Sequence, residues 1–228
     1  MDLKGFAGFA VRPFDTSVEA ERLIAFCLKN GIPYKEIKKG KCPPDLVPCG
    51  SLKWCLESLE RLVIPDYYPT WLSPYFNRRI WFSKKWPLER VFIKPADTYK
   101  RFDGFITSGT YSGKKATPFW CSEVVQFGNE WRYYVTEGKV VCSGWYWNSK
   151  VVDLPSLSAE KSSAPPAPNI SHIEIPHSFS GTLDFGDCNG SLTLVEAHHP
   201  IACGWYGPPC DDRLYFQWLV DGWRTLRA

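Results

Sequence analysis

The sequence lacks the features that would place the protein in a membrane or on a secretory route. No apolar stretch approaches the roughly 18 residues that a transmembrane helix needs. The N-terminus has no charged region followed by an apolar run and a cleavage site, so it does not resemble a signal peptide. These absences predict a cytoplasmic protein that has no membrane partner.

An excess of charge of one sign is also missing. The 228 residues carry a formal net charge of +3, whereas a dedicated nucleic-acid binder usually presents a clustered basic face. One short run of four lysines at residues 35–41 is typical of a solvated turn. We therefore expect nucleic acid not to be a partner. With 44% hydrophobic and 22% charged residues, the chain has the profile of an ordinary globular protein with one large domain or two small lobes around a cleft.

Nine cysteines are present, but the arrangements that would give them a clear role are absent. Cytoplasmic thiols stay reduced, and an odd number argues against a closed disulfide framework. The spacings of Cys42, Cys49 and Cys55 match no common zinc pattern. The His198-His199 pair adds little, because neighbours on a strand point to opposite faces. The sequence thus predicts nine reduced, buried or incidental thiols and disfavours a zinc enzyme.

Hydrophobic periodicity divides the chain into two parts. Over the first 75 residues, expected strands at 6–12, 34–37 and 46–50 alternate with two helices, one capped by Ser17 and ending near residue 30 and one over 52–62. This alternation predicts a small α/β lobe over residues 1–75. From 76 to 228 we expect strands at 80–82, 91–94, 104–107, 119–127, 131–135, 139–147, 182–185 and 192–197, and a last amphipathic helix from residue 211. The whole is predicted to be an α+β fold, with a flexible Pro-, Ser- and Ala-rich insertion at 153–169.

A lysine at the end of an apolar run is the first candidate for chemistry. Lys94 follows residues 91–93 and precedes Pro95. An unpaired ammonium inside a buried strand is costly, so one explanation is a phosphate partner; the other is a strand-end lysine that reaches solvent. The Gly-, Ser-, Thr- and Lys-containing loop 107–115 can bind phosphate through backbone N–H groups, or can be a plain solvated loop. It lacks the residue order of a P-loop.

Charged residues recur on three later strands. Glu130 and Arg132 share one face of their strand, which allows either a plain ion pair or an arginine that holds a phosphate or an acyl phosphate. Glu196 and His198 also share a face, and Asp184 lies on the strand predicted to pair with theirs. Two or three such ligands on one sheet face make a magnesium site, and the alternative is a surface strand pair with scattered acids.

These signals occur in one order along the chain: VFIKPAD-x-x-KRFDGF at 91–105, WCSEVVQF-x-x-EWRYYV at 120–135, GTLDFG at 181–186 and LVEAHHP-x-x-x-GWYG at 194–207. That order resembles the ATP-grasp superfamily, and within it the clade named for two arginines and one lysine, which includes bacterial and phage proteins. The resemblance extends back to VPCGSLKWC at 47–55 and to the Pro-rich link 65–74 before Arg78-Arg79, so it covers most of the chain.

The resemblance implies a two-lobed ATP-grasp fold that grips ATP and Mg²⁺ between its lobes. It assigns Lys94 to the α- and β-phosphates, Lys100 and the loop after it to a flap over the phosphates, and residues 123–127 to the hinge between the lobes. The nucleotide contacts that it implies are those of Lys94, Lys100, Glu123, Val124, Val125, Glu130 and Asp184.

The resemblance also implies an activity and a metal site. A substrate carboxylate would attack the γ-phosphate, near Arg132 and Lys94 as catalytic residues, and an amine would capture the acyl phosphate, so the partners are small-molecule carboxylates and amines. The implied metal ligands are Asp184, Glu196 and His198, which stands where the family typically has Asn. That departure keeps open a catalytically degenerate nucleotide-binding or interaction protein; an ATP-dependent modifier of a nucleic acid or protein is a further alternative. A phage-encoded member would work in the host cytoplasm.

Overall fold

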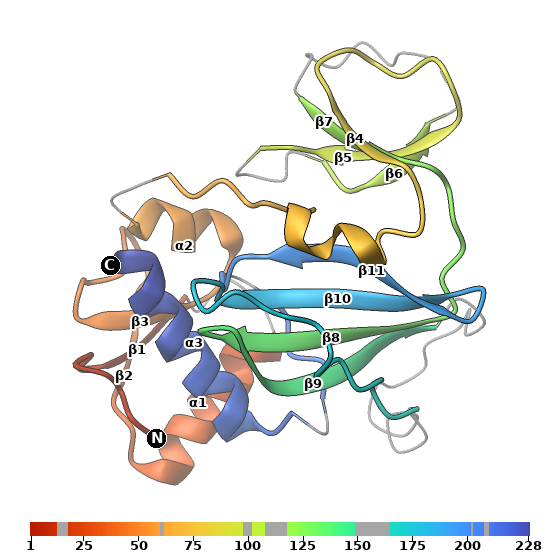
Figure 1. Ribbon diagram of the computed structural model, residues 1–228. Helices are drawn as coiled ribbons and strands as arrows, with labels where there is room; N and C mark the ends of the chain where they lie inside the picture. The colour runs from red at the N-terminus through yellow and green to blue at the C-terminus, as the bar shows by residue number, and fades with distance from the viewer. Residues whose placement is uncertain are drawn as a thin grey trace.

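The computed structural model describes residues 1–12, 18–59, 62–97, 102–107, 118–148, 165–201, 203–207 and 210–228. These residues form three sheets. One lies in an N-terminal lobe, a large one is central, and a small one is set to one side (Figure 1). None of the helices in these ranges combines the length and the apolar character needed to cross a bilayer.

The N-terminal lobe is built around a parallel sheet of order β2-β1-β3. Its strands are β1 (Gly8–Val11), β2 (Tyr34–Glu36) and β3 (Leu46–Cys49), and its helices are α1 (Val18–Asn30) and α2 (Leu52–Ser58). Leu23 and Cys27, one helical turn apart, are buried on α1. The helix ends where Gly31 adopts a φ of 64°, the left-handed conformation that favours glycine. The predicted cap Ser17 lies outside the described residues.

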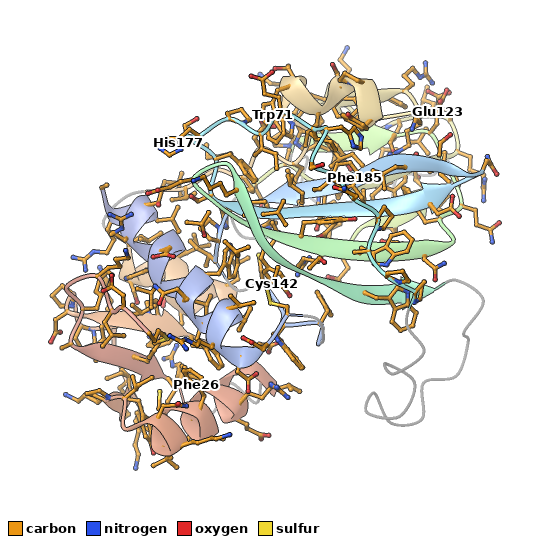
Figure 2. The ribbon with its side chains drawn as sticks, turned by 60° about the horizontal axis from the view of Figure 1, so that its bottom comes forward. Phe26, Trp71, Glu123, Cys142, His177 and Phe185 are labelled. Atoms are coloured by element: carbon orange, nitrogen blue, oxygen red, sulfur yellow. A yellow bond between two sulfur atoms is a disulfide. The ribbon has the colours of Figure 1, made fainter. Side chains whose placement is uncertain are left out.

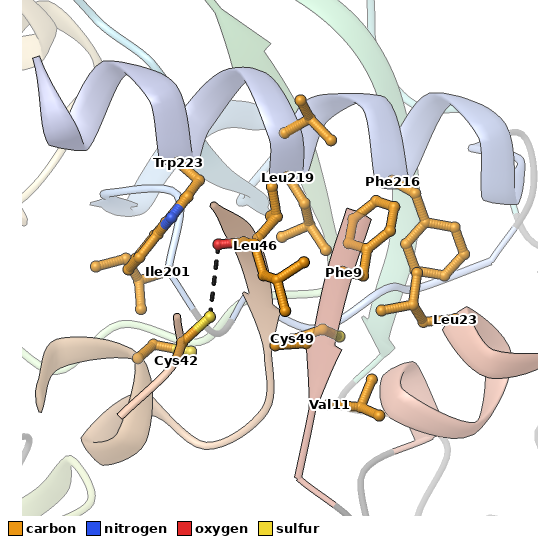
Figure 3. Packing of buried hydrophobic residues seen from close by; sticks show 14 of the residues in the cluster. Phe9, Val11, Leu23, Cys42, Leu46, Cys49, Ile201, Phe216, Leu219 and Trp223 are labelled. Atoms are coloured by element: carbon orange, nitrogen blue, oxygen red, sulfur yellow. Dashed lines mark hydrogen bonds between the residues drawn. The ribbon is translucent and has the colours of Figure 1, made fainter. Parts of the chain in front are cut away.

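The last helix of the chain completes the core of this first lobe. The N-cap of α3 (Asp212–Arg227) is Asp211, whose side chain accepts a hydrogen bond from the Leu214 N–H at 2.8 Å. Phe216 of α3 contacts the rings of Phe9 and Phe26, with centroids 6.2 and 5.1 Å apart, and Figure 3 shows it beside Phe9. The N-terminal lobe therefore shares one core with a helix more than 150 residues away in the sequence. A domain boundary near residue 75 stays a prediction.

The large sheet is antiparallel, with the order β11-β10-β8-β9. Its strands are β8 (Asn129–Thr136), β9 (Lys139–Asn148), β10 (Gly181–Cys188) and β11 (Ser191–His198). Two-residue turns at 137–138 and 189–190 connect the two hairpins, and both residues of each turn have positive φ, as a type I′ turn requires. The short helix η1 (Thr70–Tyr75) packs along β11, and α3 packs against β8 and β9 (Figure 1). The predicted strand pairs of this region are confirmed.

The small sheet is also antiparallel and has the order β4-β7-β5-β6. Its strands are β4 (Ile80–Ser83), β5 (Val91–Pro95), β6 (Phe105–Thr107) and β7 (Phe119–Ser122). The strand predicted over 119–127 is too long, because the chain leaves the sheet after residue 122 and runs without a helix or strand to β8. Residues 123–127 thus connect the small sheet to the large one, where the hinge is predicted.

Two of the nine cysteines form a disulfide, so the prediction of nine reduced thiols is wrong. Cys142 of β9 is bonded to Cys210, which lies just before α3. Figure 2 shows Cys142 on the side of the large sheet that faces α3, so the bond ties the sheet to the start of α3. An odd number of cysteines requires only that one stays free, and it therefore could not exclude this pair. Cys42, Cys49 and Cys55 are buried and take no part in this disulfide, as expected.

Thiol labelling tests this bond. Unfolded, unreduced protein is expected to expose seven reactive thiols, and reduced protein nine. Because the bond joins residues 68 positions apart, its removal by Cys142→Ser should lower the free energy of unfolding by about 4 kcal/mol. Cys210→Ser should have a similar effect, and the double variant should lose little more than either single variant. Nine labelled thiols before reduction would contradict the assignment.

Candidate active site

Three charged side chains lie in one row across the large sheet. Arg132 of β8 is the register partner of Asp184 on β10, and Asp184 is the partner of Glu196 on β11. Residues directly opposite each other in an antiparallel sheet project from the same face. The row therefore presents one cation followed by two carboxylates on a single face.

The first two members of the row form a buried ion pair. Arg132 Nε and Nη2 donate to Asp184 Oδ1 and Oδ2 at 2.8 and 2.6 Å, a bidentate arrangement. Asp184 has no exposed surface and Arg132 is 7% exposed. Desolvation lowers the pKa of Arg132, but the charge and hydrogen bonds of Asp184 raise it more, so the net pKa lies well above its usual value. The Tyr206 ring covers the pair, with its centroid 4.8 Å from Arg132 Cζ.

Lys94 extends this row, although it comes from a different sheet. It lies on β5 of the small sheet, and its Nζ donates to Glu196 Oε2. The ammonium also sits 3.5 Å from the ring centroid of Tyr67 and 5.1 Å from that of Tyr68. Burial, and next the charge of Glu196, raise the pKa of Tyr67, which keeps this phenol neutral. Lys94 is 7% exposed, so it does not reach solvent freely; its partner is the Glu196 carboxylate of the large sheet.

A cavity of about 180 Å³ opens beside this second ion pair. The small sheet and the large sheet both contribute to its wall. The lining includes the Lys94–Glu196 pair together with Tyr67, Phe92, Phe102 and Gly104. Pockets for whole small molecules usually start at about 300 Å³, so this cavity has room for only part of a larger ligand. Asp184 does not line the cavity, but its register partner Glu196 does.

The predicted metal ligands are brought together only in part. Asp184 and Glu196 stand opposite each other and offer carboxylate oxygens, the donors that Mg²⁺ prefers alongside substrate phosphates and water. His198 is the partner of Thr182, and its Nδ1 lies 3.0 Å from the His199 carbonyl oxygen. No group of three His, Cys, Asp or Glu side chains within the described ranges is placed to hold a metal ion. Both oxygens of Asp184 are, however, bonded to Arg132. A magnesium site formed by Asp184, Glu196 and His198 therefore stays a prediction.

Comparison with known proteins decides the family. A family model of the ATP-grasp domain, the second family of the clade named for two arginines and one lysine, matches residues 70–217. The chain belongs to this family. Its fold is therefore the α+β ATP-grasp fold, as the sequence motifs predict, and proteins of this superfamily are generally ATP-dependent ligases.

The chain is also similar to a solved structure. The structure, titled "Structure of ATP-grasp ligase PsnB complexed with minimal precursor", is 13% identical and has a TM-score of 0.40. The match covers 65% of this chain and 55% of the other, so this ATP-grasp protein spans about half the length of PsnB. No curated protein matches the sequence.

The other predicted residues of the ATP-grasp site have distinct places. Glu123 is exposed at the start of the link, where its Oε2 accepts a hydrogen bond from the Arg79 N–H at 2.9 Å (Figure 2). Val124 and Val125 are half-buried in the same link. Glu130 is buried on β8, two residues before Arg132. Lys100, the loop residues 108–117 and insertion residues 153–164 lie outside the described residues.

Several residues of this ATP-grasp site were not singled out from the sequence. Tyr67 and Tyr68 flank Lys94, and Tyr206 covers Arg132. Adjacent aromatic residues before a proline are equally typical of a core, so the sequence offered no signal for the first two. Tyr206 falls within the quoted GWYG segment, but only the fold places it against the Arg132–Asp184 pair.

Proposed function

We propose that this protein is an ATP- and Mg²⁺-dependent ligase that joins a carboxylate to an amine through an acyl phosphate. This proposal rests on the row Arg132–Asp184–Glu196–Lys94. The row runs from the large sheet to the small sheet beside a cavity. Phosphoryl transfer depends on fixed cations and metal ions around the developing charge more than on covalent help. The row supplies two cations and two carboxylates for that purpose.

Each residue has a role in the proposed reaction. Lys94 binds the α- and β-phosphates, and Arg132, held rigid by Asp184, faces the γ-phosphate. Asp184 and Glu196 would hold Mg²⁺, which neutralises part of the triphosphate charge. An oxygen of the substrate carboxylate attacks the γ-phosphorus and ADP leaves. The amine nitrogen then attacks the acyl carbon, phosphate leaves, and the amine loses a proton.

The proposal assigns the remainder of the nucleotide to the link and the flap. The backbone of residues 123–125 reads the adenine edge, Glu130 lies near the ribose or the substrate, and Lys100 covers the phosphates. The hinge is then residues 123–127, which connect the two antiparallel sheets. In this scheme the lobe over residues 1–75 contributes to the choice of substrate.

ADP release measured with a panel of amino acids and short peptides tests the reaction. Turnover is expected only when ATP, Mg²⁺, a carboxylate and an amine are all present, and hydroxylamine in place of the amine should trap the acyl phosphate as a hydroxamate. Glu196→Gln should reduce turnover by about 10²–10³-fold, because it removes a carboxylate proposed to hold the Mg²⁺ that would stabilise the transferring phosphoryl group. Failure of the wild-type protein to bind ATP with Mg²⁺ would refute the proposal.

A nucleotide-binding protein without turnover is the second candidate. It is favoured by His198, whose ring nitrogen lies 3.7 Å from Cys203 Sγ and 3.0 Å from a main-chain carbonyl oxygen. The same assay separates the two candidates, because a degenerate site binds ATP but gives neither ADP nor a hydroxamate with any substrate pair.

A further inference from the structure

The segment that precedes β4 covers the outer edge of the large sheet. Strand β11 is the last strand in the sheet order, so the backbone groups that face away from β10 need partners outside the ladder. Asn77 Nδ2 donates to the Leu192 carbonyl at 3.1 Å and to Thr193 Oγ1 at 2.9 Å. Further along the strand, the Ala197 N–H donates to the Tyr67 carbonyl at 2.9 Å. Two points of this segment thus hold the edge.

Between those two points β11 contains a bulge, and Arg78 binds it. Asp184 pairs with Glu196, but the next residue of β10 pairs with Leu194, so Val195 is the extra residue. In a regular strand, successive carbonyls point to opposite edges. Here Arg78 Nη1 donates to the Leu194 carbonyl at 2.7 Å and Nη2 to the Val195 carbonyl at 3.4 Å. The planar fork of one guanidinium therefore spans two consecutive carbonyls.

The surroundings of Arg78 suit a fixed structural cation. Its Cζ lies 5.9 Å from the ring centroid of Tyr68 and 5.4 Å from that of Phe127. Burial lowers the pKa of Arg78, and the nearby groups of Tyr68, Cys188 and Glu130 oppose this shift. The residue also donates to the carbonyl of Phe76, two residues back, at 3.1 Å, which anchors the side chain to its own segment.

We propose that Arg78 is a positioning residue that aims Glu196 at the nucleotide site. A β-bulge redirects the side chain that follows it, and Glu196 follows directly after Val195. Without the guanidinium, the two carbonyls lose a charged donor and the strand can return to a regular register. A one-residue slip turns a strand's side chains to the opposite face, away from Lys94. This inference rests on the proposed role of Glu196 in ATP and Mg²⁺ binding.

ATP binding with and without Mg²⁺, measured by calorimetry, tests the inference. Arg78→Met should weaken binding in the presence of Mg²⁺ by about 10–100-fold, the factor that corresponds to the loss of a charged hydrogen bond. Arg78→Lys, which keeps one donor group, should fall between that variant and the wild type. Within a Glu196→Gln background, Arg78→Met should have little further effect, because Arg78 acts through Glu196. Arg224→Met is the matched control, since Arg224 pairs with Glu137 on the surface.

Two results would overturn the inference. Equal losses from Arg78→Met in the wild-type and Glu196→Gln backgrounds would show that Arg78 only supports the fold. A crystal structure of Arg78→Met that keeps the Val195 bulge and the Glu196–Lys94 pair would show that the guanidinium does not set them. If the wild-type protein binds no ATP, the proposed function fails, and the crystal structure alone then decides the role of Arg78 in the bulge.

Discussion

Asp184→Asn is expected to lower the free energy of unfolding by about 3–5 kcal/mol, because it leaves a buried cation without its counter-charge. Asp184 has no exposed surface, and both of its oxygens accept hydrogen bonds from Arg132, which is itself 7% exposed. Asparagine keeps the shape of the side chain and one acceptor but not the charge. Urea denaturation followed by tryptophan fluorescence measures the difference.

The surface pair Glu137–Arg224 provides the control. Both of its side chains are about 45% exposed, so Glu137→Gln should change the free energy of unfolding by only about 0–1 kcal/mol. Replacing both buried partners, as Arg132→Met with Asp184→Leu, should recover much of the stability lost in Asp184→Asn. Wild-type stability in Asp184→Asn would contradict the prediction. Loss of activity in an Asp184 variant is consequently weak evidence for a metal ligand, whereas Glu196 lines the cavity and gives a cleaner test.

The local sequence predicted most of the secondary structure because the deciding signals are short-range. The Asn189–Gly190 turn fixes the hairpin of β10 and β11, whereas the pairing of Asp184 with Glu196 also requires the bulge at Val195. Asp211 caps the last helix, whose apolar positions recur at helical spacing. Two of the proposed site residues were therefore correctly predicted to lie on paired strands.

Interactions between distant segments could not be predicted in the same way. Lys94 donates to Glu196, which lies 102 residues later in the sequence, and Arg78 donates to the Leu194 carbonyl, which lies 116 residues later. The disulfide partner of Cys142 is 68 residues away. No local pattern specifies such a partner, because each pairing depends on how the lobes pack. The sequence therefore indicated that Lys94 needs a counter-charge or solvent, and only the fold supplied the carboxylate.

The strand end before the hinge shows a further limit. Residues 119–127 are apolar enough to be predicted as one strand, yet pairing with β4 and β5 stops at Ser122. A strand ends where its neighbours end, and that length is a property of the sheet. The predicted position of the hinge depended on the family resemblance, whose order of motifs placed EVVQ between two strands.

Glu196→Gln is expected to have opposite effects on ATP binding with and without Mg²⁺. In the absence of metal, binding should become about tenfold tighter, equivalent to about 1.4 kcal/mol, because the triphosphate no longer competes with a carboxylate for Lys94 and no longer meets its negative charge. Lys94 Nζ donates to Glu196 and lies 3.5 Å from the centroid of the Tyr67 ring, so few directions are left for a phosphate oxygen. With Mg²⁺ present, the same change should weaken binding, since a carboxylate that suits the metal is lost.

Lys94→Met distinguishes this exchange from a simple loss of the site. It removes the phosphate-binding cation, so it should weaken ATP binding by at least about tenfold under both conditions, the scale of one charged hydrogen bond. Glu137→Gln, a carboxylate change remote from the site, should leave both affinities as in the wild type. Calorimetric titrations with ATP, with EDTA in one series and excess Mg²⁺ in the other, measure all four proteins. If Glu196→Gln shifts both affinities in the same direction, Glu196 does not alternate between Lys94 and the metal. A carboxylate shared by Lys94 and Mg²⁺ opposes ATP binding when the metal is absent and supports it when the metal is present, so its removal must shift the two affinities in opposite directions.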